Sequence, residues 1–220
     1  MKSLLSIICS KKVKYSFILI FLFFLYISIN AFSYASYVSE DIASSVFRLH
    51  VIANSDSTED QNLKYIVRDK VIAYMNEINT ASNKLDVIEL TKEHLDDFQA
   101  IAERTIQEEG YDYPVSVEIG NFYFPTKNYG DISLPAGDYD ALRINIGDAK
   151  GQNWWCVMFP PLCFVNVTSG VVPEDSKNMM KQELSNESYH IISDTNSSEV
   201  KFKFKLIEWL QNVNILTANK

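Results

Sequence analysis

Histidine, cysteine, glycine and proline are all scarce in this chain of 220 residues, which has 3 His, 3 Cys, 7 Gly and 6 Pro. The histidines, His50, His94 and His190, are widely separated, and the sequence has no Cys-x-x-Cys or His-x-x-x-His spacing of the kind that binds zinc. A Gly-x-Ser-x-Gly elbow and a phosphate-binding glycine loop are also missing. We therefore expect no metal, no cofactor and no serine-hydrolase chemistry.

Acidic residues are missing from the first 39 positions, since the first is Glu40. Lysines stand ahead of an apolar run from Ser16 to Ile29, and small residues that suit signal peptidase end at Ala35. The run is shorter than the roughly 20 residues of a spanning helix, although counting through Tyr34 nearly reaches that length. We expect residues 1–35 to be a signal peptide, or a retained amino-terminal membrane anchor, and the rest to be exported.

The remainder of the chain has a large excess of acidic residues. The leader holds four of the 20 basic residues, so 16 remain against 28 acidic ones and the net charge becomes −12. An acidic surface repels nucleic acid and anionic lipid headgroups. We therefore expect no nucleic-acid partner, and contact with a membrane only through the leader or a partner.

Two strands and two turns are predicted in the central part of the chain. Residues Pro135–Gly137 suit a turn, and Asp140–Ile146 alternates like a half-buried strand. Gly147–Gly151 has the length of a five-residue hairpin loop. Trp154–Phe159 is a more apolar strand, which Pro160 ends because proline cannot donate to a ladder. The pattern therefore predicts a hairpin of two adjacent strands.

Alternating and helical patterns predict the other elements of the domain. These are a strand at Val46–Ala53, a helix from about Asp56 to Asn79, a second helix from Asn83 to Gly110, and a strand at Pro114–Gly120. Their order predicts an α+β fold with two layers, in which both helices cover one face of a small, mainly antiparallel sheet.

Composition divides the exported part into three segments. Residues 36–166 are predicted to form the globular domain, which begins with a polar lead-in at Ser36–Ser45. Residues 167–198 are rich in Ser, Asn, Asp and Glu and are predicted to form a polar flexible linker. Residues 199–220 begin with alternating Lys and Phe and are predicted to be an amphipathic docking segment.

The two cysteines outside the leader, Cys156 and Cys163, have three interpretations. In an exported chain they are candidates for a disulfide across the Pro-Pro corner, and the alternative is two free, buried thiols. A third hypothesis makes Cys156 a nucleophile with His50 as base and Asp56 as orienting acid, the residue types of a catalytic triad. Burial in an apolar strand counts against this hydrolase hypothesis, since reactive thiolates occupy partly open, electropositive sites.

A partner surface is the main alternative to catalysis. Alternation sends only one of Trp154 and Trp155 into the core, and an exposed tryptophan is a common interface anchor. Arg48 and His50 lie opposite Phe47 on their strand and form either a partner surface or a plain polar face. The candidate partner-binding residues are Arg48, His50, Asn54, Ser55, Asp56, Pro135, Gly137, Asn153, Trp154 and Trp155.

Several segments together resemble the stage II sporulation protein R family. The resemblance covers about Val46 to Val165 and includes long, unusual motifs. They are RLHVIANSDS from Arg48, FPTK from Phe124, LPAG from Leu134, NWWCV from Asn153 and FPPLCF from Phe159.

The resemblance implies a non-enzymatic signal in endospore-forming bacteria. Such a protein is made in the forespore and exported into the space between the two membranes. There it activates a membrane-embedded aspartic protease of the mother cell, of the stage II sporulation protein GA type, which processes pro-sigma-E. Besides the signal and the cysteine hydrolase, a third hypothesis is a structural protein of the intermembrane space.

Overall fold

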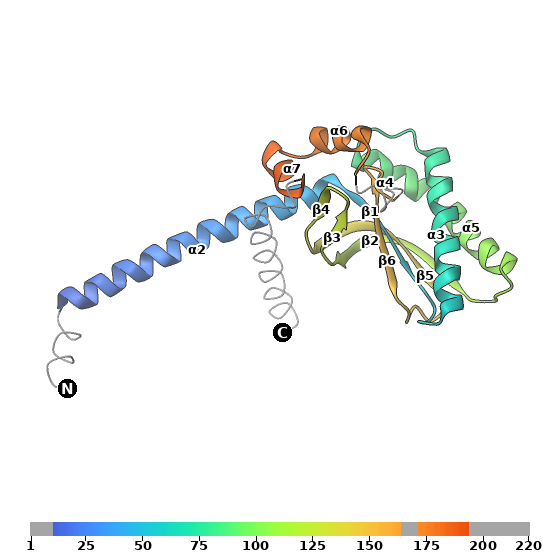
Figure 1. Cartoon of the computed structure of the whole chain (residues 1–220), viewed down its shortest axis with the longest axis horizontal. Coiled ribbons are helices and arrows are strands. Elements are labelled where there is room, and N and C mark those ends of the chain that lie inside the picture. Colours follow the sequence, from blue (N-terminus) through green and yellow to red (C-terminus); the bar gives the residue numbers. More distant parts are fainter. Residues whose placement is uncertain (1–10, 164–170, 194–220) are drawn as a thin grey trace. The chain divides into compact units, whose positions relative to one another are not determined.

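The computed structural model describes residues 11–163 and 171–193 (Figure 1). The chain divides into two compact units, one that ends at Val38 and one that begins at Ser39. Helix α2 (Lys11–Ser45) is long and apolar enough to cross a membrane, a criterion that signal sequences also meet. The sequence assigned no secondary structure to the polar lead-in at Ser36–Ser45, and in the structure the helix continues through it to Ser45. Its last turns belong to the second unit, where Ile42 is buried and Asp41 accepts a hydrogen bond from Ser185.

Among the described residues, four strands form the main sheet, in the order β2 (Val115–Phe124), β5 (Gly137–Ile146), β1 (Phe47–Ile52) and β6 (Asn153–Phe159). Strand β1 runs parallel to β5 and antiparallel to β6, and β2 runs antiparallel to β5. The sheet is therefore mixed and mainly antiparallel, and the predicted α+β class is confirmed.

The predicted hairpin between β5 and β6 is wrong, because β1 lies between these strands. The connecting loop instead crosses the end of β1, where the amides of Lys150 and Gly151 donate to the carbonyls of Asn54 (3.2 Å) and Ala53 (2.9 Å). Almost every residue of β1 is buried, which suits a central strand with neighbours on both edges. Loop length alone does not distinguish a hairpin from this crossing.

Helices α3 (Thr58–Ile78), α4 (Lys84–Glu93) and α5 (Leu95–Glu108) pack on one face of the sheet (Figure 1). Ser57 caps α3, since its hydroxyl accepts from the amide of Asp60. The predicted single second helix is divided at His94, which leaves helical backbone geometry and ends α4. Three helices therefore form the layer for which two were predicted.

The core lies between these helices and the inward residues of the sheet. Each central strand contributes alternate residues to it. Its main members are Phe47, Leu49, Val51, Leu63, Val67, Val71, Phe98, Ala102, Ile106, Leu142, Ile144, Cys156 and Met158.

The opposite face of the sheet is partly covered by a short hairpin of β3 (Lys127–Tyr129) and β4 (Ile132–Leu134). Its Tyr129 contacts Arg48, which projects from β1 away from the helices. Near β1, both faces of the sheet are therefore buried.

The segment predicted to be a flexible linker contains two helices, α6 (Glu174–Glu183) and α7 (Asn186–Ser193). The few apolar residues of these helices are buried, among them Met180 and Ile192. Helix α7 packs against β4. The linker prediction is therefore wrong for these helices, and the predicted docking segment at 199–220 lies outside the described residues.

Candidate functional site

The candidate residues of β1 are buried on the face of the sheet opposite the helices. Arg48 has no exposed surface and His50 is only 8% exposed. The prediction that they form an exposed polar or partner surface is therefore wrong. The cause is the cover that the β3–β4 hairpin and neighbouring aromatic rings supply on this face.

Arg48 is held by aromatic rings. Its guanidinium carbon lies 4.1 Å from the ring centroid of Phe124 and 4.7 Å from that of Tyr139, and Nη2 donates to the Tyr129 hydroxyl at 2.8 Å. Across residues 11–163 and 171–193, no carboxylate pairs with it, and Nε and Nη1 have no partner. Cation–π contacts stabilise the charge in place of an acid. Arg48 is thus a core residue that a partner cannot reach.

His50 connects β1 to the candidate tryptophans. Its Nε2 donates to Oδ1 of Asn153 at 2.6 Å, and its ring stacks on Trp155 at a centroid distance of 5.8 Å. Burial lowers the pKa of His50 below its usual value of 6.5; the hydrogen bond to Asn153 offsets this only in part, and the nearby Arg143 and Arg48 lower the pKa further. His50 is therefore neutral near pH 7 and fixes the positions of Asn153 and Trp155.

Trp154 and Trp155 lie on opposite faces of β6, as alternation predicts, and both are partly exposed. The Trp154 ring meets Tyr65 edge to face at 5.6 Å, and the Arg68 guanidinium lies 4.2 Å from its centroid. On the other face, Lys127 Nζ lies 4.5 Å from the Trp155 centroid. Sequence reasoning assigned no role to these cations, although Lys127 belongs to the FPTK segment that carries the family resemblance.

The turn after β1 uses its polar groups internally. The side chains of Asn54 and Ser55 donate to Oδ2 of Asp60 at 2.8 and 2.6 Å. Burial would raise the pKa of Asp60, but these hydrogen bonds outweigh it and hold that pKa below its usual value. A Cβ at Gly151 would lie 2.1 Å from the Ser55 carbonyl oxygen, so only glycine fits there. Of the predicted contact residues in this turn, Asp56 is exposed.

The predicted surface is only partly assembled. The register pairs Ile52 with Asn153, so the Asn54–Asp56 turn and the tryptophans lie at the same end of the sheet. Pro135 precedes β5 and Gly137 is its first residue; both are buried near the start of β1, at the opposite end of the sheet. The Pro135–Gly137 turn is therefore not part of the surface that carries the tryptophans.

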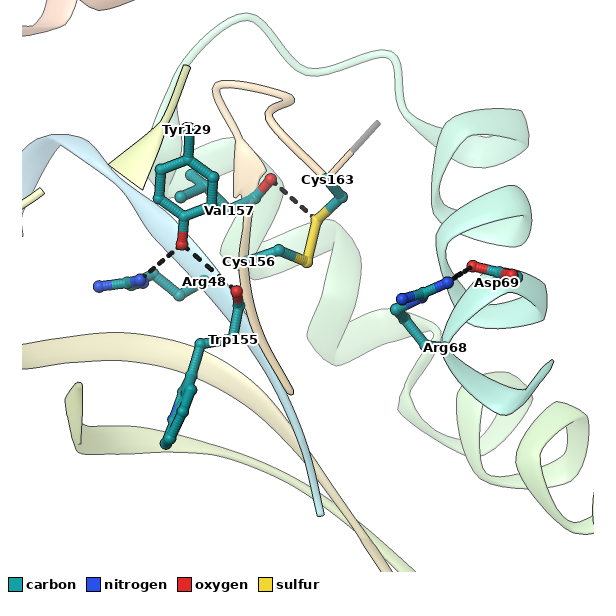
Figure 2. The surroundings of a disulfide bond; sticks show 8 residues. All are labelled: Arg48, Arg68, Asp69, Tyr129, Trp155, Cys156, Val157 and Cys163. Atoms are coloured by element: carbon teal, nitrogen blue, oxygen red, sulfur yellow. Dashed lines mark hydrogen bonds and ion pairs between the residues drawn. A yellow bond between two sulfur atoms is a disulfide. The ribbon is translucent and has the colours of Figure 1, made fainter. Parts of the chain in front are cut away.

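The hypothetical cysteine triad is not assembled. Cys156 is joined to Cys163 in a disulfide with a Cα–Cα distance of 5.2 Å (Figure 2). Cys156 faces the helices, whereas His50 projects from the other face of the sheet, so the sheet separates the thiol position from the base. No group of three or more His, Cys, Asp or Glu residues that suits a metal ion occurs in the described parts.

Acidification should weaken the fold through His50. Because its folded pKa is below 6.5, the unfolded chain binds the proton first, and stability falls as pH drops below about 6.5 until folded His50 is also protonated. The loss is at most about 1.4 kcal/mol per pH unit. Urea unfolding at about pH 7.5 and 5.5 should show a smaller loss in His50→Gln than in the parent chain. An equal loss in both chains would contradict this, and His190→Gln, at an exposed position on α7, is the control.

Comparison with known proteins gives two matches. Residues 43–169 match the family model described as stage II sporulation protein R. The stage II sporulation protein R of Bacillus subtilis (strain 168) is 33% identical over 190 residues, which cover 78% of this chain and 83% of that protein. No solved structure matches.

Proposed function

Because the chain belongs to the stage II sporulation protein R family, we propose that it is an exported signal that activates a mother-cell membrane protease during sporulation. It is made in the forespore and acts in the space between the two membranes. Its partner is an aspartic protease of the stage II sporulation protein GA type, which then processes pro-sigma-E. The chain itself makes and breaks no bond.

The observation that carries this proposal is the pair of partly exposed tryptophans at one end of a domain that follows an apolar leader helix. Partly buried aromatic rings anchor protein interfaces because they bury a large area at little cost in side-chain entropy. A ligand activates a protease only if it binds the active state more tightly than the inactive one. Trp154 and Trp155 supply that differential contact.

The rival hydrolase requires a reactive thiol, and the geometry does not favour one. Cys156 is 1% exposed and disulfide-bonded, whereas thiolate nucleophiles occupy partly open sites. The signal hypothesis needs no such group.

Co-expression in a non-sporulating host tests the proposal. The full chain, the candidate protease and pro-sigma-E are produced together, and the cleaved sigma factor is measured by immunoblot. Cleavage should require all three proteins. In Trp155→Ala, loss of an anchor should reduce cleavage at least about tenfold, the effect of 1.4 kcal/mol or more at an interface hot spot.

Leu85→Ala is the matched control, because Leu85 is an apolar side chain that is 75% exposed and lies on α4, outside the proposed surface. It should leave cleavage unchanged. Absence of cleavage when all three intact proteins are present would refute the proposed function. Normal cleavage in both Trp154→Ala and Trp155→Ala would refute only the role of the tryptophans and would leave the proposed function standing.

A further inference from the structure

Cations gather around the two tryptophans although the chain is acidic. Arg68 lies against both Trp154 and Tyr65, at 4.2 and 4.9 Å from their ring centroids, and Lys64 lies 4.6 Å from Tyr65. Lys127 lies over Trp155 on the other face. Arg68 also pairs with Asp69 at 2.7 Å, but Asp69 is 59% exposed, so this pair contributes little energy. Arg68 and Lys127 therefore place one cation beside each tryptophan, one on each face of β6.

Strand β6 is an edge strand, since it pairs only with β1 among the described strands. The carbonyls of Trp155 and Val157 point away from β1, because they accept from the Tyr129 hydroxyl (3.4 Å) and the Leu162 amide (3.0 Å). The Leu162 turn and the disulfide occupy the Val157 end (Figure 2). The partly exposed part of the edge is Asn153–Trp155, whose main-chain groups alternate in direction as in any strand.

We propose that this edge binds an extended acidic segment of the partner protein, which adds to β6 as a further strand. Successive side chains of an added strand point to opposite faces. Two consecutive acidic residues would therefore place one carboxylate toward Arg68 and Trp154, and the next toward Lys127 and Trp155. Figure 2 shows Arg68 and Trp155 on opposite sides of β6. The inference rests on the proposed function for the identity of the partner, but not for the binding chemistry.

Charge decides among the possible occupants. The lysine-rich run at 201–205 of this chain has the same sign as Arg68 and Lys127, so it is not the occupant. Anionic lipid suits the cations, but the net charge of −12 without the leader opposes a membrane surface, and lipid makes no use of the strand edge. An acidic peptide uses both the cations and the main-chain groups.

A synthetic peptide tests the inference directly. The full chain in detergent micelles is titrated into a fluorescein-labelled, capped peptide of sequence TVTVEDVTVT, and binding is followed by fluorescence anisotropy. Replacing the central Glu-Asp by Gln-Asn should weaken binding about tenfold, since charge-assisted hydrogen bonds are lost. N-methylation of alternate peptide amides should also abolish binding, because it removes the donors of an added strand.

Charge-neutral variants locate the site. Arg68→Gln and Lys127→Gln should each weaken the acidic peptide about fivefold or more, since each removes one charge partner. Arg104→Gln and Lys92→Gln are the matched controls, because these exposed cations lie on α5 and α4, and they should have little effect. Circular dichroism of each variant confirms that it is folded.

Each outcome has one meaning. Equal affinity for the acidic and neutral peptides, no peptide binding, or an unchanged affinity in Arg68→Gln and Lys127→Gln would overturn the inference. Binding of phosphatidylglycerol vesicles, lost in the same variants while the peptide fails to bind, would also overturn it. Peptide binding without protease activation would refute the proposed function and leave the inference standing. Protease activation without peptide binding would overturn the inference and leave the proposed function standing.

Discussion

An Arg48→Ala variant should be less stable than Arg48→Met by about 2–5 kcal/mol, the cost of truncating a long buried side chain to alanine. The Arg48 stem and guanidinium fill the space beside Phe124 and Tyr139, and alanine leaves that space empty. Methionine restores most of the volume and removes the cost of burying a charge that has no acidic partner in the described structure. Denaturant unfolding of the full chain measures the free energy of unfolding of the two variants.

The same pair of variants separates packing from partner contact. Since Arg48 has no exposed surface, Arg48→Met should activate the protease as well as the parent chain does. A folded Arg48→Met that fails to activate would show that Arg48 reaches the partner, and would restore the assignment made from the sequence. Equal stability of the alanine and methionine variants would contradict the packing argument.

Removing the disulfide should cost about 2.5 kcal/mol, the chain-entropy estimate for closing a loop between cysteines seven positions apart. The melting temperature of Cys156→Ser/Cys163→Ser should fall by roughly 5–10 °C, as expected for a domain of this size. The bond joins the middle of β6 to the turn that follows the strand, so its loss frees that turn. Thermal unfolding without reductant gives the shift, and the mass of the intact protein reports whether the bond forms.

Cys9→Ser is the control, since it removes only the thiol of the leader. This variant should keep the intact mass expected for one disulfide and should melt at the same temperature as the parent chain. Below its melting temperature, the double serine variant should still activate the protease, because neither sulfur acts in the proposed mechanism. A folded double variant that is inactive would support the hydrolase hypothesis instead.

Local sequence patterns predicted the elements of the fold better than their pairing. Alternation located β1, β2, β5 and β6, because one face of each strand is buried against the helices. It did not predict the order of the strands, since pairing depends on contacts between residues far apart in the chain. Helices α6 and α7 were missed because their buried apolar residues are few and widely spaced in a polar segment.

The candidate site was predicted in part for the same reason. Composition identified Trp154 and Trp155, and alternation predicted that they diverge. The sequence analysis placed Arg48 and His50 on the surface, because a positive or polar side chain usually lies outside the core. Only the folded chain brings Phe124 and Tyr139, which come much later in the sequence, onto Arg48.

The central position of β1 has a consequence for biosynthesis. This strand is the first part of the sheet to leave the ribosome, yet both of its neighbours, which begin at Gly137 and Asn153, are made much later. Until they arrive, an apolar segment stays unpaired and open to chaperones, proteases and aggregation. A nascent chain that stops short of Phe159 leaves one edge of that strand unpaired, so the sheet is complete only after most of the domain has been synthesised.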